Sequence, residues 1–163
     1  DQRSSNTNPH SGVDFGASYT ELYAAASGTV IDVINYCEDT SVAIQKLRER
    51  LGRYPSVGDI GEASKQGDEI ATIINCGGTG GNKVTIQHDG EGEGYSTYYG
   101  HMSEVYVETG VYVEQGDVIG KSGNSGFTTG PHLHFMLFST SEPYPSHIDP
   151  APFIKTIKKC DSN

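Results

Sequence analysis

The sequence lacks the long apolar run that a membrane-spanning helix requires. Such a helix needs about 20 consecutive apolar residues, and no stretch of the 163 residues approaches that length. Basic residues are also scarce, since 11 Lys and Arg stand against 21 Asp and Glu, for a formal net charge of −10. A nucleic-acid partner requires a basic face that neutralises its phosphates. We therefore expect a chain without a membrane span and without a nucleic-acid partner.

Cysteine is scarce as well. The three residues are Cys37, Cys76 and Cys160, and no CxxC or CxxH spacing is present, which disfavours a cysteine metal cluster. Three cysteines permit one disulfide in three pairings, or none if all three are separate thiols. We favour Cys37–Cys76, because these two residues bracket a segment whose pattern differs from its surroundings. A disulfide would indicate an oxidising, extracytoplasmic setting. The chain begins at Asp1 rather than Met, which predicts a processed product or a fragment.

Glycine, by contrast, is abundant, with 21 residues against 7 prolines, which is typical of short strands joined by turns. Strand-like patterns occupy residues 13–17, 21–36, 83–88, 95–102, 107–123 and 131–138. The sequence therefore predicts a mainly β fold with an antiparallel sheet or barrel-sandwich-like core, as a single domain over residues 1–163. Two β-turn-β phrases, LYAAASGTVIDV and VYVEQGDVIGKS, are similar to those of lipoyl or biotinyl carriers. No lysine occupies the setting that a swinging arm needs, so a carrier domain is disfavoured.

A helical insertion is predicted at about 38–76. Residues 39–52 read as a helix, with an Asp, Thr or Ser available at 39–41 as a cap and Gly52 at its end. Residues 56–75 fit either a second helix or a loop with a late strand. A disulfide between Cys37 and Cys76 would join the two ends of this insertion.

The stretch TGPHLHFML carries His132 and His134 two residues apart in an apolar run. On a strand, these two side chains face one side, while Leu133 and Phe135 face the other and fill the core. One imidazole can then bind a metal while its neighbour stands beside a bound water. An HxH pair alone is a weak signal, equally typical of a surface pair.

The stretch NPHSGVDFGA places His10 and Asp14 four residues apart, and Gly12 gives the backbone freedom to bring both side chains together. Imidazole nitrogen and carboxylate oxygen are standard zinc ligands, and with one histidine of the HxH pair they make three. A hydrolytic zinc site has this number of protein ligands and an open fourth position. Taken alone, HxxxD also fits an exposed loop histidine beside an Asp that caps a turn.

A third stretch, YSTYYGHM, ends a predicted strand with His101. This histidine is either a base that faces the site or a strand-end residue packed against neighbouring tyrosines. If the strand is regular, Tyr95, Thr97 and Tyr99 share a face with His101, where they line a groove or pack across strands. We expect the two remaining histidines to be structural (His88) and exposed (His147).

Together these stretches resemble the lysostaphin-type zinc endopeptidases, which cut bacterial cell-wall peptides. The matching phrases are HSGVDFGA, YAAASGTV, GNKVTIQHDG, YSTYYGHM, GDVIGKSGNSG and GPHLHF. The resemblance implies that His10, Asp14 and His134 hold one zinc ion per chain. It also implies that His101 and His132 are the catalytic pair. Zinc lowers the pKa of a bound water to about 7 and polarises a carbonyl, and the two histidines would then handle the proton and the developing oxyanion.

Three features depart from that family, and one of them is the large insertion bracketed by cysteines, which we expect on the rim of the groove. Met136 stands where a glutamate usually follows the HxHF phrase, and no tyrosine precedes His10 to help stabilise an oxyanion. No HExxH motif is present, so a glutamate base on a helix is not available.

The resemblance implies a secreted or extracytoplasmic enzyme that hydrolyses peptide bonds in peptidoglycan stem or cross-bridge peptides, which we expect to be a monomer. The alternative is a non-catalytic wall-binding or regulatory module on the same fold. Retention of all five site residues disfavours that alternative. The sequence leaves open which peptide bond is cut.

Overall fold

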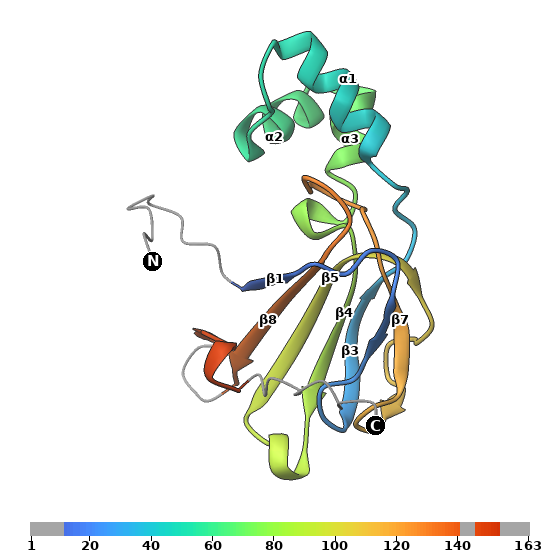
Figure 1. Cartoon of the computed structure of the whole chain (residues 1–163), viewed down its shortest axis with the longest axis vertical. Coiled ribbons are helices and arrows are strands. Elements are labelled where there is room, and N and C mark those ends of the chain that lie inside the picture. The colour runs from blue at the N-terminus through green and yellow to red at the C-terminus, as the bar shows by residue number, and fades with distance from the viewer. Residues whose placement is uncertain (1–11, 141–145, 154–163) are drawn as a thin grey trace, which may run out of the picture.

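The computed structural model describes residues 12–140 and 146–153, and nine antiparallel strands dominate this part of the chain (Figure 1). Their bounds are β1 Val13–Phe15, β2 Glu21–Tyr23, β3 Gly28–Ile34, β4 Asn82–His88, β5 Tyr95–Val105, β6 Tyr112–Val113, β7 Val118–Ser122, β8 Leu133–Ser139 and β9 Ser146–Ile148. The main path of the sheet runs β1-β8-β5-β4-β3-β6, while β7 joins β5 to β2 and β9 extends the sheet from β8. The predicted antiparallel β fold is confirmed.

The core of the sheet follows from the alternation of apolar residues along its strands. Every second residue of β4 is buried, as expected for a strand that presents one face to a core. Val30, Ile86, Tyr99, Met102 and Ile119 pack in this cluster, which we call the sheet core. The ring of Tyr99 has its hydroxyl bonded to the backbone N–H of Ala25 at 2.8 Å, so its one polar atom is satisfied.

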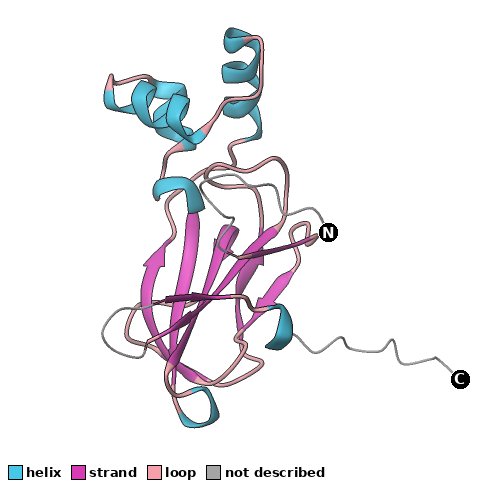
Figure 2. Ribbon diagram, turned by 90° about the vertical axis from the view of Figure 1, so that its left-hand side faces the viewer, coloured by secondary structure: helices cyan, strands magenta, loops and turns pink. Residues whose placement is uncertain are grey.

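Three helices lie between β3 and β4 and form a separate body at one end of the sheet (Figures 1 and 2). They are α1 Ser41–Leu51, α2 Val57–Lys65 and α3 Glu69–Ile74. Their buried apolar residues make a second cluster, the insertion core, of Ala43, Ile44, Leu47, Ile60, Ala71 and Ile74. We call residues 38–75 the insertion.

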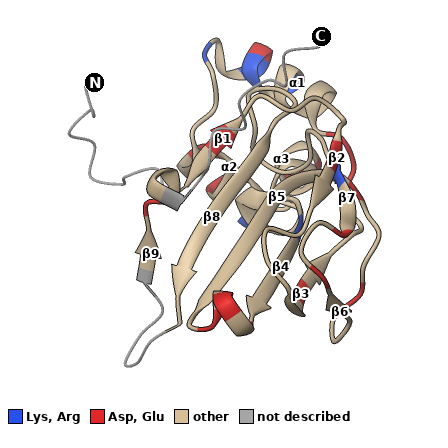
Figure 3. Cartoon of the chain, turned by 60° about the horizontal axis from the view of Figure 1, so that its bottom comes forward, with Lys and Arg blue, Asp and Glu red and all other residues tan. Residues whose placement is uncertain are grey.

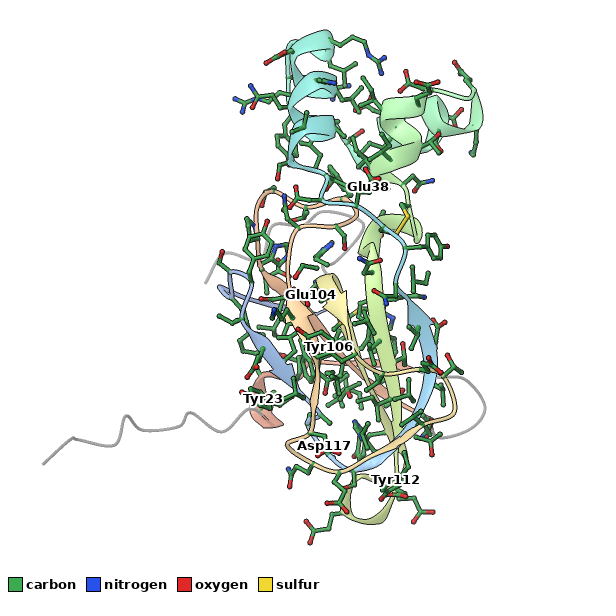
Figure 4. All side chains as sticks on the ribbon, turned by 90° about the vertical axis from the view of Figure 1, so that its right-hand side faces the viewer. Tyr23, Glu38, Glu104, Tyr106, Tyr112 and Asp117 are labelled. Atoms are coloured by element: carbon green, nitrogen blue, oxygen red, sulfur yellow. A yellow bond between two sulfur atoms is a disulfide. The ribbon has the colours of Figure 1, made fainter. Side chains whose placement is uncertain are left out.

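The predicted Cys37–Cys76 disulfide is confirmed, and it joins the two ends of the insertion beside the sheet (Figure 4). Cys160 lies outside the described residues. The assignment of residues 1–163 to a single domain remains a prediction.

The predicted helix at 39–52 is also confirmed, and Gly52 ends it in the left-handed region with φ 66°. Residues 56–75, which the sequence left ambiguous, form two helices rather than a strand. A capping box between Ser56 and Asp59 begins α2, and the Asp68 carboxylate accepts from the N–H of Ala71 at the start of α3. Both caps are side chains that favour helix starts, so the local sequence carried the signal.

Two histidines outside the predicted site behave as expected. His88 is buried, and its two ring nitrogens contact the carbonyl oxygen of Ser27 at 3.2 Å and the hydroxyl of Thr97 at 2.8 Å. His147 is exposed and packs edge-on against the ring of Phe138. Within the described ranges, none of the helices has the length and apolar character needed to cross a membrane.

Candidate active site

Asp14 and His134 lie directly opposite each other on the paired strands β1 and β8. Their neighbours in the register, Phe15 and Phe135, belong to the apolar packing around the sheet core, so the strand alternation turns Asp14 and His134 to the other face. The Asp14 Oδ1 and His134 Nδ1 atoms are 2.8 Å apart. A carboxylate oxygen and an imidazole nitrogen therefore meet at one point on the surface of the sheet.

Gly12 permits this close approach of the two strands. A Cβ atom at this position would lie 2.5 Å from the carbonyl oxygen of Phe135 and 3.0 Å from Cε1 of His134. Glycine is therefore required here for space against β8.

His132 directly precedes β8 and lies beside the same carboxylate. Its Nε2 is 3.5 Å from Asp14 Oδ1, and its Nδ1 is 2.7 Å from the carbonyl oxygen of Gly130 and 3.1 Å from Thr128 Oγ1. A carbonyl only accepts hydrogen bonds, so Nδ1 carries the hydrogen. In the neutral ring, Nε2 is then the nitrogen that can take up a proton.

His101 reaches the site through an irregularity in β5. Its φ of 61° is one of two positive values among the non-glycine residues of the described part, and the pairing register of β5 with β7 shifts just after it. The ring of His101 lies 4.6 Å from that of His132 and 5.8 Å from that of His134, between ring centroids. The structure therefore brings together four of the five predicted site residues.

The ring of His101 is held in one orientation and in its neutral form. Its Nδ1 lies 2.8 Å from the carbonyl oxygen of Ser125, so Nδ1 donates and Nε2 is left as the basic nitrogen. Burial lowers the pKa of His101 to about 4, against a smaller opposing effect of the Ser125 bond. The side chain is therefore uncharged at neutral pH.

Tyr95, Thr97 and Tyr99 were expected to share a face with His101 only if the strand is regular, and the irregularity at His101 removes that condition and leaves Tyr99 packed in the core. Tyr99 belongs to the sheet core, and the hydroxyl of Thr97 bonds Tyr99 and His88. The prediction assumed strict alternation, and the positive φ at His101 breaks it.

Tyr98 is the aromatic residue that the sequence reasoning missed. Its ring lies edge-on to that of His134 with 6.2 Å between centroids. It covers Gly100, where a Cβ atom would lie 2.7 Å from Tyr98 Cε1. Burial raises the pKa of Tyr98 to about 12, so its hydroxyl stays protonated. A glycine inside a strand often marks such a close approach, so Gly100 was the available signal.

The loop between β7 and β8, residues 123–132, carries the groups that orient both His101 and His132. Ser125 is anchored below His101, because its hydroxyl bonds the carbonyl oxygen of Met102 at 2.8 Å and the N–H of Asn82 at 2.9 Å. We call residues 123–132 the histidine loop.

The insertion contacts the histidine loop at several points. The buried Thr40 hydroxyl lies 2.9 Å from the carbonyl oxygen of Asn124 and 2.7 Å from that of Gly126. The Tyr54 hydroxyl donates to the carbonyl oxygen of Thr128 at 2.9 Å. Phe127 packs against the insertion core and against the ring of Tyr54. The insertion therefore supports the histidine loop, which in turn orients His101 and His132.

The chemistry of the described pair fits a zinc ion. Asp14 and His134 offer one carboxylate oxygen and one imidazole nitrogen, both standard zinc ligands, at a site where the Asp14 side chain is 47% exposed and that of His134 is 14% exposed. Within residues 12–140 and 146–153, no three His, Cys, Asp or Glu side chains are grouped as for a metal. The third predicted ligand, His10, lies outside the described residues.

Comparison with known proteins agrees with this geometry. Residues 72–146 match the sequence profile of peptidase family M23. The chain is 40% identical over 78 residues to lysostaphin of Staphylococcus simulans, an overlap of 47% of this chain and 15% of lysostaphin. It is 42% identical over 77 residues to the peptidoglycan DD-endopeptidase ShyA of Vibrio cholerae, an overlap of 47% of this chain and 17% of ShyA. The chain thus spans only about a sixth of the length of these curated relatives.

Among solved structures, the catalytic domain of lysostaphin from Staphylococcus simulans superposes with a TM-score of 0.56 at 27% sequence identity. The match covers 91% of this chain and 80% of that domain. Sequence and fold therefore point to the same group of enzymes. Residues 72–146 match peptidase family M23, and the described part of the chain shares its fold with the lysostaphin catalytic domain.

Proposed function

We propose that this protein is a zinc-dependent endopeptidase that hydrolyses peptide bonds in peptidoglycan stem or cross-bridge peptides. The observation that carries the proposal is the convergence of Asp14, His101, His132 and His134 on one face of the sheet. The names of the relatives support the substrate class, since ShyA is a peptidoglycan DD-endopeptidase. We further propose that the enzyme acts outside the cytoplasm and as a monomer, and the disulfide fits an oxidising compartment.

In this proposal Asp14, His134 and His10 hold one zinc ion. When bound, the ion supplies Lewis acidity to the scissile carbonyl and to the attacking water. Asp14 and His134 already face each other at 2.8 Å on two paired strands, so the sheet fixes their relative position before the metal binds. The exposure of Asp14 leaves the site open to a peptide from solvent.

His132 and His101 move the proton. Both rings carry their hydrogen on Nδ1, which a carbonyl oxygen of the histidine loop holds in place. Each therefore presents a basic Nε2, and the rings are adjacent. We assign to this pair the removal of a proton from the attacking water and its delivery to the leaving amine. Once charged, either ring can also stabilise the oxyanion that forms at the scissile carbonyl.

The test is hydrolysis of purified peptidoglycan of different cross-link chemistries, with mass spectrometry of the released peptides. We expect the zinc-loaded protein to release peptides from at least one wall type, and chelation to stop the reaction until zinc is restored. A zinc-loaded protein that binds wall fragments and releases no peptide would instead identify a non-catalytic wall-binding module. The same assay shows which bond is cut.

A further inference from the structure

A pocket separate from the predicted metal site lies between α1 and the histidine loop. Its cavity volume is about 190 Å³, below the range of roughly 300–1,000 Å³ of typical small-molecule sites, so it suits one side chain rather than a whole ligand. It is lined by Ser41, Ile44, Gln45, Arg48, Tyr54, Asn124, Thr128, Thr129, Gly130 and Pro131. One wall thus comes from the insertion and the other from the histidine loop.

The pocket adjoins the catalytic histidine that the histidine loop orients. Thr128 and Gly130 line it, and both contact His132 Nδ1, at 3.1 Å for Thr128 Oγ1 and 2.7 Å for the Gly130 carbonyl oxygen. A substrate residue next to the scissile bond would therefore fall within reach of this pocket. Its position makes it a candidate subsite of the proposed peptidase.

Most basic residues of the described part of the chain lie on the insertion, which also carries seven Asp and Glu (Figure 3). Seven Lys and Arg are described, and five of them lie within residues 41–65: Lys46, Arg48, Arg50, Arg53 and Lys65, with Lys83 and Lys121 in the sheet. All but two of the seven have a carboxylate oxygen within 4.0 Å. The two exceptions among the described residues are Lys46 and Arg48, and of these only Arg48 lines the pocket.

The rest of the pocket wall combines apolar residues, Ile44 and Pro131 among them, with polar side chains. Ser41, Gln45 and Thr129 contribute hydrogen-bonding side chains. Asn124 donates through Nδ2 to the hydroxyl of Ser41 at 2.6 Å. Its Oδ1 is the one buried side-chain polar atom in the described part that has no hydrogen-bond partner. An amide oxygen, like a carboxylate oxygen, only accepts hydrogen bonds, so the donors that this wall offers to a carboxylate are the side chains of Gln45 and Thr129.

We propose that this pocket is a substrate subsite for a carboxylate-bearing residue of the peptide, with Arg48 as the residue that selects it. A guanidinium group binds a carboxylate through charge-assisted hydrogen bonds. The inference rests on the proposed peptidase function and adds a preference among peptides. It gives the insertion a role in substrate selection, which is separate from the binding of zinc.

The test uses two synthetic stem peptides that differ at one residue, which is glutamate in one and its carboxamide in the other. We expect wild-type protein to cleave the carboxylate peptide with a kcat/KM about tenfold higher, as one charge-assisted contact would give. Arg48→Gln should bring the two peptides to within about twofold of each other. Lys46→Gln is the matched control, because it removes the same charge from an exposed position on the same helix, and it should keep the preference.

Calorimetric binding of the same two peptides to the zinc-loaded His132→Ala variant, with and without Arg48→Gln, separates the two proposals. Equal binding of both peptides, or a preference that survives Arg48→Gln, would overturn the subsite. Cleavage of neither peptide, together with no release from any wall type, would contradict the peptidase function. In that case the binding comparison still decides the pocket.

Discussion

Removal of the Cys37–Cys76 disulfide should destabilise the protein and disturb the site at the same time. The bond spans a sequence separation of 39, and in the chain-entropy model closing a loop of that length stabilises the folded state by about 4 kcal/mol. The insertion core has six buried apolar residues, and it is separate from the sheet core. The disulfide therefore contributes much of the stability that holds the insertion in place.

In the Cys37→Ala/Cys76→Ala variant, we expect the free energy of unfolding, measured by guanidinium denaturation, to fall by about 2 to 4 kcal/mol. Because Phe127 and Tyr54 link the insertion to the histidine loop, we also expect kcat to fall about tenfold or more while zinc content is retained. Cys160→Ala is the control for loss of a thiol and should change neither quantity.

Two results would refute this reasoning. An unfolding free energy unchanged to within about 0.5 kcal/mol would show that the disulfide does not constrain the chain. A variant that is less stable but cleaves at the wild-type rate would show that the insertion does not position the histidine loop.

Three further predictions follow from single contacts. Tyr54→Phe removes the 2.9 Å bond to the Thr128 carbonyl oxygen, so stability should fall by about 1 kcal/mol and kcat several-fold with zinc content unchanged; an unaltered kcat would contradict the link to the histidine loop. Gly12→Ala puts a Cβ atom 2.5 Å from the Phe135 carbonyl oxygen, so chelator competition should show weaker zinc binding, and wild-type affinity would show that close strand contact is not required. The pKa of His101 is about 4 in the folded protein and near 6.5 in the unfolded chain, so the unfolded state binds more protons as the pH falls below about 6.5. The free energy of unfolding of the metal-free protein should therefore fall by about 2 kcal/mol between pH 7 and pH 5, and that of a His101→Gln variant should fall by less.

Local sequence patterns were enough for most of the fold. Alternating residues in β4, Gly52 at the end of α1 and the bracketing cysteines all act over short stretches or mark segment ends, and each was confirmed. The predicted capping role was wrong for Thr40, which occupies the cap position of α1 but makes no capping hydrogen bond and bonds the histidine loop instead. The HxH spacing predicted that His132 and His134 face one side, and both lie within 4.0 Å of Asp14 Oδ1.

The rest depended on contacts that no local pattern encodes. The left-handed backbone at His101 interrupts the alternation of side chains along β5. As a result Tyr98 lies beside the site, while Tyr99 packs in the sheet core. The contacts of Thr40 with the histidine loop join residues 84 and 86 positions apart. Such pairings arise only when the sheet and the insertion pack together, so sequence periodicity could not reveal them.

The most direct test of the account is the zinc content of three purified variants compared with wild type, measured by inductively coupled plasma mass spectrometry alongside peptide release from walls. Asp14→Ala and His134→Ala should lose both the metal and hydrolysis. His132→Ala should keep about one zinc per chain and lose hydrolysis, because in this account His132 moves a proton and does not hold the ion. Loss of zinc in His132→Ala, or full activity without that side chain, would contradict the separate roles proposed for His132 and His134.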